Sequence, residues 1–170
     1  MMKKIKTQID GCYIFSLPKS KDLRGFFERL YCKKKISFNI KQINLSTNLK
    51  KGTLRGFHYQ ASPSKEHKII SCVSGSLFNV LIDMRKKSKS YKKIFRYNLT
   101  SLDDKFLYLP AGCANCFLTL ENNTKILYYM QDYYKKNKNL GFNYKSKFAK
   151  INWPTKIKII SNQDKSLPFI

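Results

Sequence analysis

The chain has no apolar run that approaches the roughly 18 residues needed for a membrane-spanning helix. Its first six residues, MMKKIK, lack the apolar stretch of a signal peptide. No segment of the sequence repeats. We therefore expect a protein of the cytoplasm with no membrane partner.

Histidine is scarce as well, with 2 in the whole chain, and there is a single C-x-x-C pair, Cys113 to Cys116. A four-ligand metal site is hard to assemble from so few donors, so a metal-dependent enzyme is disfavoured. The 5 cysteines are odd in number and most lie in apolar contexts, which favours free, buried thiols. We expect neither a metal nor another cofactor.

Acidic residues are few: 10 Asp and Glu face 34 Lys and Arg, giving a formal net charge of +24. Such an excess usually indicates a polyanionic partner such as nucleic acid, whose binding would weaken steeply with salt and would not depend on His58. Here the lysines are scattered along the chain among many Asn and Ile, residues that all have AT-rich codons, and no RNA-binding or helix-turn-helix signature accompanies them. We therefore expect no nucleic-acid partner, and a field that mildly attracts a small anionic substrate.

What the chain does contain is a series of short strand-like segments. Its 170 residues suffice for one domain with a core, so we assign residues 1–170 to a single domain. Tyr, Phe and Ile are abundant, which favours strands. Antiparallel strands in a sandwich or barrel are predicted by the regular turns between the candidates, which are residues 6–17, 38–46, 68–73, 77–83, 93–99, 105–109, 116–120 and 124–130. The tail, residues 152–170, is expected to pack on these strands as an irregular arm or short helix.

The heptapeptide LRGFHYQ, residues 54–60, is the stretch most suggestive of chemistry. Histidine titrates near neutrality, so His58 in a pocket could take or give a proton. Arg55 adds a forked positive charge suited to phosphate. Taken alone, a histidine in a strand is more often a packed core or surface residue than a catalyst, so the functional interpretation depends on what accompanies it.

Further motifs stand in a fixed order around the heptapeptide. They are Arg-Gly-Phe-Phe beginning at Arg24, Gln42 with Asn44, Lys68 at the start of a strand, Asp83-Met84-Arg85, Pro110-x-Gly112, Tyr128 followed by Tyr133-Tyr134, Trp153-Pro154, and Ser161-x-x-Asp164. This collinear set resembles the dTDP-4-dehydrorhamnose 3,5-epimerase family over nearly the whole chain. The resemblance implies an all-β fold, a cupin-type jelly-roll or β-sandwich with short helical elements near the C-terminus.

The resemblance also implies a reaction that needs no cofactor. The family inverts carbons beside the ketone of a nucleotide-linked 4-keto-6-deoxy sugar, because the carbonyl acidifies the neighbouring C–H bonds. By resemblance, His58 is the base and Asp164 is the carboxylate that orients it. Lys68 is expected to stabilise the enolate, and Tyr128 to return a proton to the opposite face.

Substrate contacts are implied in the same way. Arg24 and Arg55 resemble the pyrophosphate contacts of the family, and Gln42 and Asn44 resemble its sugar contacts. The ring of Tyr134 is expected near the base. Phe27, in the loop of Arg24, and Asn115 complete the expected substrate-binding set.

Several positions depart from the family pattern. Asn115 stands where the family has a second active-site histidine, and Asn79 stands where it has an aspartate. The acid after the Arg-Gly-Phe-Phe loop is displaced to Glu28, and residues 144–146 replace a Trp-Asn-Asp. An amide cannot shuttle a proton, so we expect a changed outcome: another sugar or nucleotide, or epimerisation at one carbon.

Two interpretations therefore remain open. The first is a cofactor-independent nucleotide-sugar epimerase, expected to be a homodimer in which the Arg24 loop lies near the pocket of the partner. The second is a catalytically silent jelly-roll that binds a nucleotide sugar. Loss of solvent exchange on substitution of His58 would favour the first.

Overall fold

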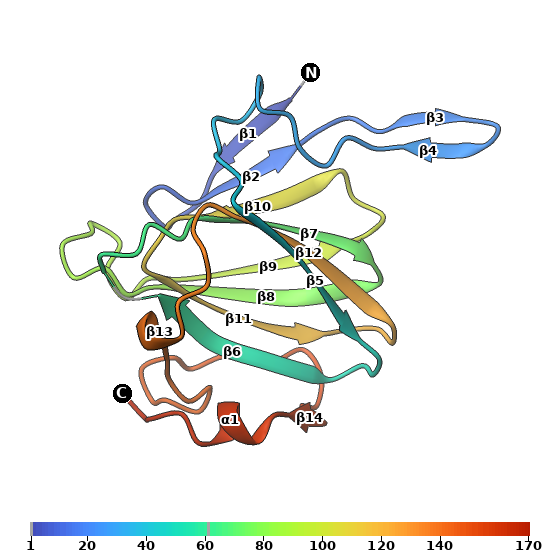
Figure 1. The fold of residues 1–170 in the computed structure, drawn as a ribbon. Helices are drawn as coiled ribbons and strands as arrows, with labels where there is room; N and C mark the ends of the chain where they lie inside the picture. Colours follow the sequence, from blue (N-terminus) through green and yellow to red (C-terminus); the bar gives the residue numbers. More distant parts are fainter. Residues whose placement is uncertain (1, 61) are drawn as a thin grey trace.

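The computed structural model describes residues 2–60 and 62–170, which form two six-stranded sheets packed face to face (Figure 1). The first sheet is antiparallel, in the order β1 (Lys3–Lys6), β2 (Tyr13–Ser16), β10 (Lys105–Leu109), β7 (Lys68–Ser74), β12 (Thr124–Met130) and β5 (Gln42–Asn48). The second has the order β13 (Asn139–Gly141), β6 (Thr53–Gln60), β11 (Cys113–Thr119), β8 (Ser76–Asp83) and β9 (Ile94–Thr100), and its sixth strand, β14 (Ile159–Ile160), pairs with β6 outside this order. The predicted all-β sandwich is confirmed.

The remaining elements are short. A hairpin of β3 (Ser20–Asp22) and β4 (Gly25–Phe27) projects from the body of the molecule (Figure 1). Near the C-terminus come the 3-10 helix η1 (Lys136–Lys138), then β14 (Ile159–Ile160), which pairs parallel with β6, and the helix α1 (Asn162–Lys165). No helix in the described part of the chain has the length and apolar character needed to cross a membrane.

The central core lies between the sheets because strand residues two apart point to the same face. Ile70 and Ile126 of the first sheet meet Leu77 and Leu81 of the second in one buried cluster. Val80, between the last two, faces the opposite side and packs beneath the C-terminal segment, residues 142–160. Because β8 is covered on both faces, its sequence is almost continuously apolar rather than alternating.

The cores outside the sheets explain two other features of the sequence. Residues 30–40 cover the outer face of the first sheet, where Phe38 packs on Tyr108. The predicted arm at the C-terminus covers the second sheet, with the ring of Trp153 edge-on to Phe78. Cys113 belongs to the central core and Cys116 to the outer one, so the two thiols of the C-x-x-C pair lie on opposite faces of β11.

Three predicted strands have different boundaries in the structure, and one of them, expected over residues 116–120, begins three residues earlier as β11. A single strand over residues 6–17 is wrong: β1 ends at Lys6 and β2 begins at Tyr13. Between them the Thr7 hydroxyl donates to the Cys12 carbonyl at 3.1 Å and closes a turn. Likewise β5 begins at Gln42 rather than at residue 38, because Phe38 is buried in the outer core instead of entering the sheet.

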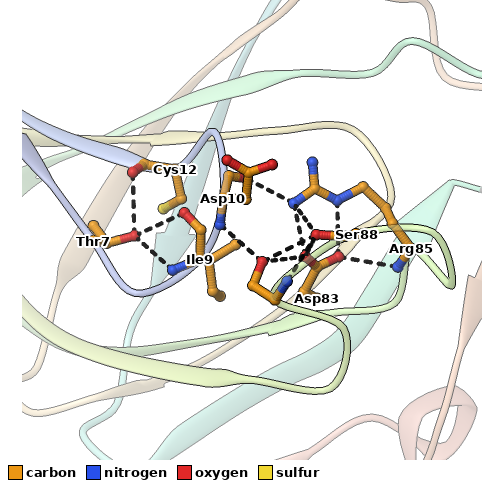
Figure 2. Close-up of polar contacts among 8 residues, drawn as sticks. Thr7, Ile9, Asp10, Cys12, Asp83, Arg85 and Ser88 are labelled. Carbon is orange, nitrogen blue, oxygen red and sulfur yellow. Dashed lines mark hydrogen bonds and ion pairs between the residues drawn. The ribbon is translucent and has the colours of Figure 1, made fainter.

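A buried carboxylate fastens this N-terminal turn to the end of β8 (Figure 2). Asp83 has no exposed surface and accepts hydrogen bonds from Arg85 Nε at 2.8 Å and from the Ser88 and Ser90 hydroxyls at 2.6 Å each. Arg85 in turn donates to the Asp10 carbonyl at 2.6 Å. Burial works to raise the pKa of Asp83, but these hydrogen bonds outweigh it and lower the pKa from 3.8 to about 2.

We expect Asp83→Asn to lower the free energy of unfolding at pH 7 by about 3 kcal/mol, because it leaves Arg85 without its anion. A carboxyl whose folded pKa is depressed stabilises the protein above its unfolded pKa and loses that contribution as the pH falls through the folded value. The gap between wild type and variant should therefore shrink by about 2 kcal/mol between pH 5 and pH 2.

Urea unfolding at a series of pH values measures both effects. Asp103→Asn is the matched control, since it removes a surface ion pair with Lys105 at 4.0 Å and should cost less than about 1 kcal/mol. A stability gap between wild type and Asp83→Asn that does not change with pH would contradict the assignment.

Candidate active site

A cavity of about 480 Å³ is lined by both sheets and by the segment that contains β14 and α1. Eleven residues were predicted to form the site, and the structure brings six of them to the cavity wall. They are Arg55 and His58 of β6, Lys68 of β7, Asn115 of β11, Tyr128 of β12 and Asp164 of α1.

His58 and Asp164 are within hydrogen-bond distance although they lie 106 positions apart: His58 Nε2 is 2.8 Å from Asp164 Oδ1. Pairing of Ile160 with Leu54 places α1 alongside β6. The helix then begins at Ser161, whose hydroxyl accepts a hydrogen bond from the Asp164 amide at 3.0 Å, an N-cap that fixes the carboxylate toward the strand.

The second oxygen of the Asp164 carboxylate accepts a hydrogen bond from the Gly56 amide at 3.0 Å. Gly56 has a φ of +120°, and a Cβ there would lie 2.5 Å from the Asn115 carbonyl oxygen, so glycine is required at this position. Burial tends to raise the pKa of Asp164, but the hydrogen bonds from His58 and Gly56 outweigh it, and the pKa lies below its ordinary value. The carboxylate is therefore charged at neutral pH.

Lys68 and Tyr128 face the dyad from the opposite sheet. In the pairing of β12 with β7, Tyr128 lies opposite Ile70 and Met130 lies opposite Lys68. The lysine and the tyrosine are therefore two register positions apart on the same face of the sheet. Burial raises the pKa of Tyr128, which the positive charge of Arg55 only partly offsets. The phenol consequently holds its proton at neutral pH and can act as an acid.

Arg55 is oriented by a residue that the sequence did not single out. Its Nε donates to Asn48 Oδ1 at 2.9 Å, while Asn48 Nδ2 donates to the Thr124 carbonyl at 3.2 Å. Asn48 is buried at the end of β5. The guanidinium, exposed at the cavity wall, is thus held in place by a fixed amide and presents its remaining N–H groups to solvent or a ligand.

The two asparagines that depart from the family pattern occupy neighbouring strands. Asn115 lies opposite His58 on one side and opposite Leu81 on the other, and Asn79 lies two positions from Leu81 on the same face of β8. Asn79 is 1% exposed. Within residues 2–60 and 62–170, neither amide atom of Asn79 nor Oδ1 of Asn115 has a hydrogen-bond partner. Of the two, Asn115 lines the cavity, where it places a neutral amide opposite His58.

Glu66 contacts a residue of the cavity wall, although the sequence analysis did not single it out. Its carboxylate Oε1 lies 2.7 Å from Lys68 Nζ, and its side chain is 4% exposed. The sequence carried no clear signal of this contact, because Glu66 precedes β7 in a segment that turns, where the His67 amide donates to the Lys65 carbonyl.

The other predicted substrate contacts lie outside the cavity wall. Arg24 and Phe27 are on the projecting hairpin, where Arg24 pairs with Asp22 at 2.6 Å and Phe27 is 73% exposed. Gln42 and Asn44 are joined by a hydrogen bond of 2.9 Å on the edge strand β5.

Those two amides nevertheless lie on the strand next to β12, which carries Tyr128 of the cavity wall. Asn44 lies opposite Tyr128 in the pairing of β5 with β12, and Gln42 lies opposite Met130. Tyr134 is beside them, since its amide donates to Gln42 Oε1 at 3.3 Å. The edge of the first sheet is thus a polar rim that continues from the cavity.

Comparison with known proteins identifies the group to which this architecture belongs. The family model for dTDP-4-dehydrorhamnose 3,5-epimerase matches residues 6–170. The epimerase of Shigella flexneri is 32% identical over 171 residues, which cover 96% of this chain and 93% of the relative. The chain belongs to the dTDP-4-dehydrorhamnose 3,5-epimerase family.

Solved structures of the epimerase family share the whole fold. The epimerase from Bacillus anthracis, which contains TDP and PPi, superposes with a TM-score of 0.95 at 31% identity and covers 100% of both chains. The enzyme from Legionella pneumophila, bound to dTDP-4-keto-L-rhamnose, gives a TM-score of 0.92 at 28% identity and covers 99% of this chain and 93% of that one. The predicted family and its jelly-roll fold are confirmed.

Proposed function

We propose that this protein is a cofactor-independent epimerase of a dTDP-linked 4-keto-6-deoxy sugar. The observation that carries the proposal is the meeting of the His58–Asp164 dyad with Lys68 and Tyr128 in one cavity. The family to which the chain belongs, and the TDP and keto-sugar ligands of the two solved relatives, support the substrate class.

The proposed reaction begins with removal of a proton from a carbon beside the ketone. His58 Nε2 contacts Asp164, so Nδ1 is the ring atom that takes the proton, and the buried carboxylate stabilises the imidazolium that results. The electron pair of the C–H bond moves onto the carbonyl oxygen, where the Lys68 ammonium stabilises the enolate. Tyr128 then donates its proton to the opposite face of the carbon, which inverts it.

Arg55 is proposed to bind the pyrophosphate of the nucleotide at the cavity wall, where Asn48 holds its guanidinium. The polar rim of Gln42 and Asn44 is proposed to contact the sugar, with the Tyr134 ring beside it. All five cysteines are free thiols, which supports the proposal that the protein acts in the reducing cytoplasm.

The function is tested by product analysis. The purified protein is incubated with dTDP-4-keto-6-deoxyglucose, the ketone is reduced with borohydride, and the sugars are separated by configuration at C3 and C5. Inversion at both carbons is expected of a full 3,5-epimerase, and inversion at one carbon is expected if the neutral pair Asn79 and Asn115 restricts the reaction. Binding of dTDP without any conversion would indicate the silent sugar-binding protein instead.

We further propose a homodimer in which the β3–β4 hairpin of one subunit completes the pocket of the other. The hairpin carries three exposed apolar side chains, Leu23, Phe26 and Phe27, around the cation Arg24. Surface of this kind is normally covered by a partner. Arg24 and Phe27 would then supply the substrate contacts that they cannot supply within their own subunit.

Mixing one weakened and one inactive variant tests this arrangement. Arg24→Ala should raise KM about tenfold through loss of a charged hydrogen bond, and His58→Asn should be inactive. If the hairpin serves the partner, mixed dimers contain one intact site, and an equal mixture regains about a quarter of wild-type activity at low substrate. Activity that never exceeds the average of the two separate variants would place Arg24 in its own subunit's site.

A further inference from the structure

A buried carboxylate stands behind the lysine of the proposed active site. The Glu66 side chain is 4% exposed, and its Oε1 lies 2.7 Å from Lys68 Nζ. An anion so deeply buried is stable only when it is paired and hydrogen-bonded. Lys68 satisfies one of its oxygens, and the lysine is therefore tied to a fixed point of the protein rather than free in the cavity.

The second carboxylate oxygen of Glu66 is held by β6. Gln60 Nε2 donates a hydrogen bond to Glu66 Oε2, and Gln60 is itself buried. Gln60 lies two positions after His58, in the same strand. The contacts therefore run from Gln60 through Glu66 to Lys68 and join the strand that carries the base to the ammonium.

The charges around Lys68 make this anion important. Arg55, His58, Tyr128 and Asp164 line the same cavity, and Asp164 is already paired with His58. When His58 takes the substrate proton, the cavity gains a second cation besides Arg55. Nearby cations favour the neutral form of a lysine, and a nearby anion favours the charged form.

We propose that Glu66 is a positioning residue that aims Lys68 at the enolate oxygen by holding its ammonium in an ion pair. The proposal rests on the proposed function, because it assigns Glu66 a part in that same site. Glu66 acts through the lysine and does not touch the sugar.

Glu66→Gln tests the proposal, since glutamine keeps the shape of the side chain but removes its charge. We expect kcat at pH 7.5 to fall about tenfold to a hundredfold, as for a displaced catalytic group, with KM changed less than about threefold. Glu121→Gln, on an exposed turn where the carboxylate accepts a hydrogen bond from Ser76, is the matched control with wild-type kinetics.

A double-mutant cycle shows whether Glu66 acts through Lys68. In a Lys68→Ala background, Glu66→Gln should have no further effect on kcat, because the residue it positions is gone. Full, multiplicative losses from the two substitutions would overturn the proposal, as would an unchanged kcat in the single variant.

A measurement without substrate separates this proposal from the proposed function. Acetic anhydride modifies only the neutral amine of lysine, and peptide mass spectrometry follows the Lys68 peptide. Released from its ion pair, Lys68 should be labelled faster at pH 7.5 in Glu66→Gln than in wild type. Faster labelling in a protein that does not convert the sugar would show that Glu66 holds Lys68 but would refute the function. Equal labelling in an active enzyme would overturn the proposal and leave the function standing.

Discussion

Replacing His58 with asparagine should lower the rate of epimer formation by about 10²- to 10⁴-fold, the contribution of a positioned general base. The asparagine amide reaches about as far as Nδ1 of the imidazole but not as far as Nε2, so the contact with Asp164 at 2.8 Å is lost as well. It has no atom that accepts a proton at neutral pH. Initial rates of epimer formation, read by chromatography of the reduced sugars, measure the effect.

The second histidine of the chain offers a matched control. His67 lies next to Lys68 in sequence, but its Nδ1 is 3.0 Å from the Tyr108 hydroxyl and it packs against that ring. His67→Asn should keep the rate within about threefold of wild type. Wild-type activity in His58→Asn, with folding and dTDP binding intact, would remove His58 from the role of base.

Asp164→Asn should cost about 10³- to 10⁴-fold in kcat, comparable to loss of the carboxylate from other histidine–carboxylate pairs. The depressed pKa of Asp164 shows that the folded protein favours its charged form, and that charge stabilises the imidazolium of His58. An amide keeps one hydrogen bond but supplies no charge. Its NH₂ group must face either the N–H of His58 or the N–H of Gly56, which places one donor against another.

The substitution acts on the reaction rather than on substrate binding, so KM should change little while kcat falls. Steady-state kinetics measure this split, and Lys165→Ala, next to Asp164 on α1 but exposed and outside the cavity wall, serves as a local control for the integrity of the helix. A rise in KM at unchanged kcat would mean that Asp164 binds the sugar instead of assisting the base.

Sequence patterns were sufficient for the layers of the fold. The apolar runs and turns of residues 68–130 predicted the central strands, and β7, β8, β10 and β12 begin within a residue of their predicted starts. Turns closed by side chains were harder to predict. The turn within residues 6–17 is closed by the Thr7 hydroxyl, and Thr7 is one ordinary threonine in an otherwise strand-like stretch.

The site required contacts between distant parts of the chain. No periodicity can place Asp164 against a residue 106 positions away; the family motifs did so, because they describe a whole fold. The resemblance likewise placed the Arg24 loop at a substrate site, whereas within one subunit that loop is the tip of a projecting hairpin. Glu66 was missed because its role follows from burial, which a lone acidic residue in a polar stretch does not reveal.

The most direct test of the account is proton NMR of dTDP-4-keto-6-deoxyglucose with the purified protein in D₂O. Removal and return of a proton beside the ketone predict that deuterium replaces hydrogen at C3, at C5 or at both, and that His58→Asn abolishes this exchange. Incorporation at one carbon would show that the restricted reaction accompanies Asn79 and Asn115. If neither carbon gained deuterium while the protein bound dTDP, the cavity would be a binding site without enolate chemistry.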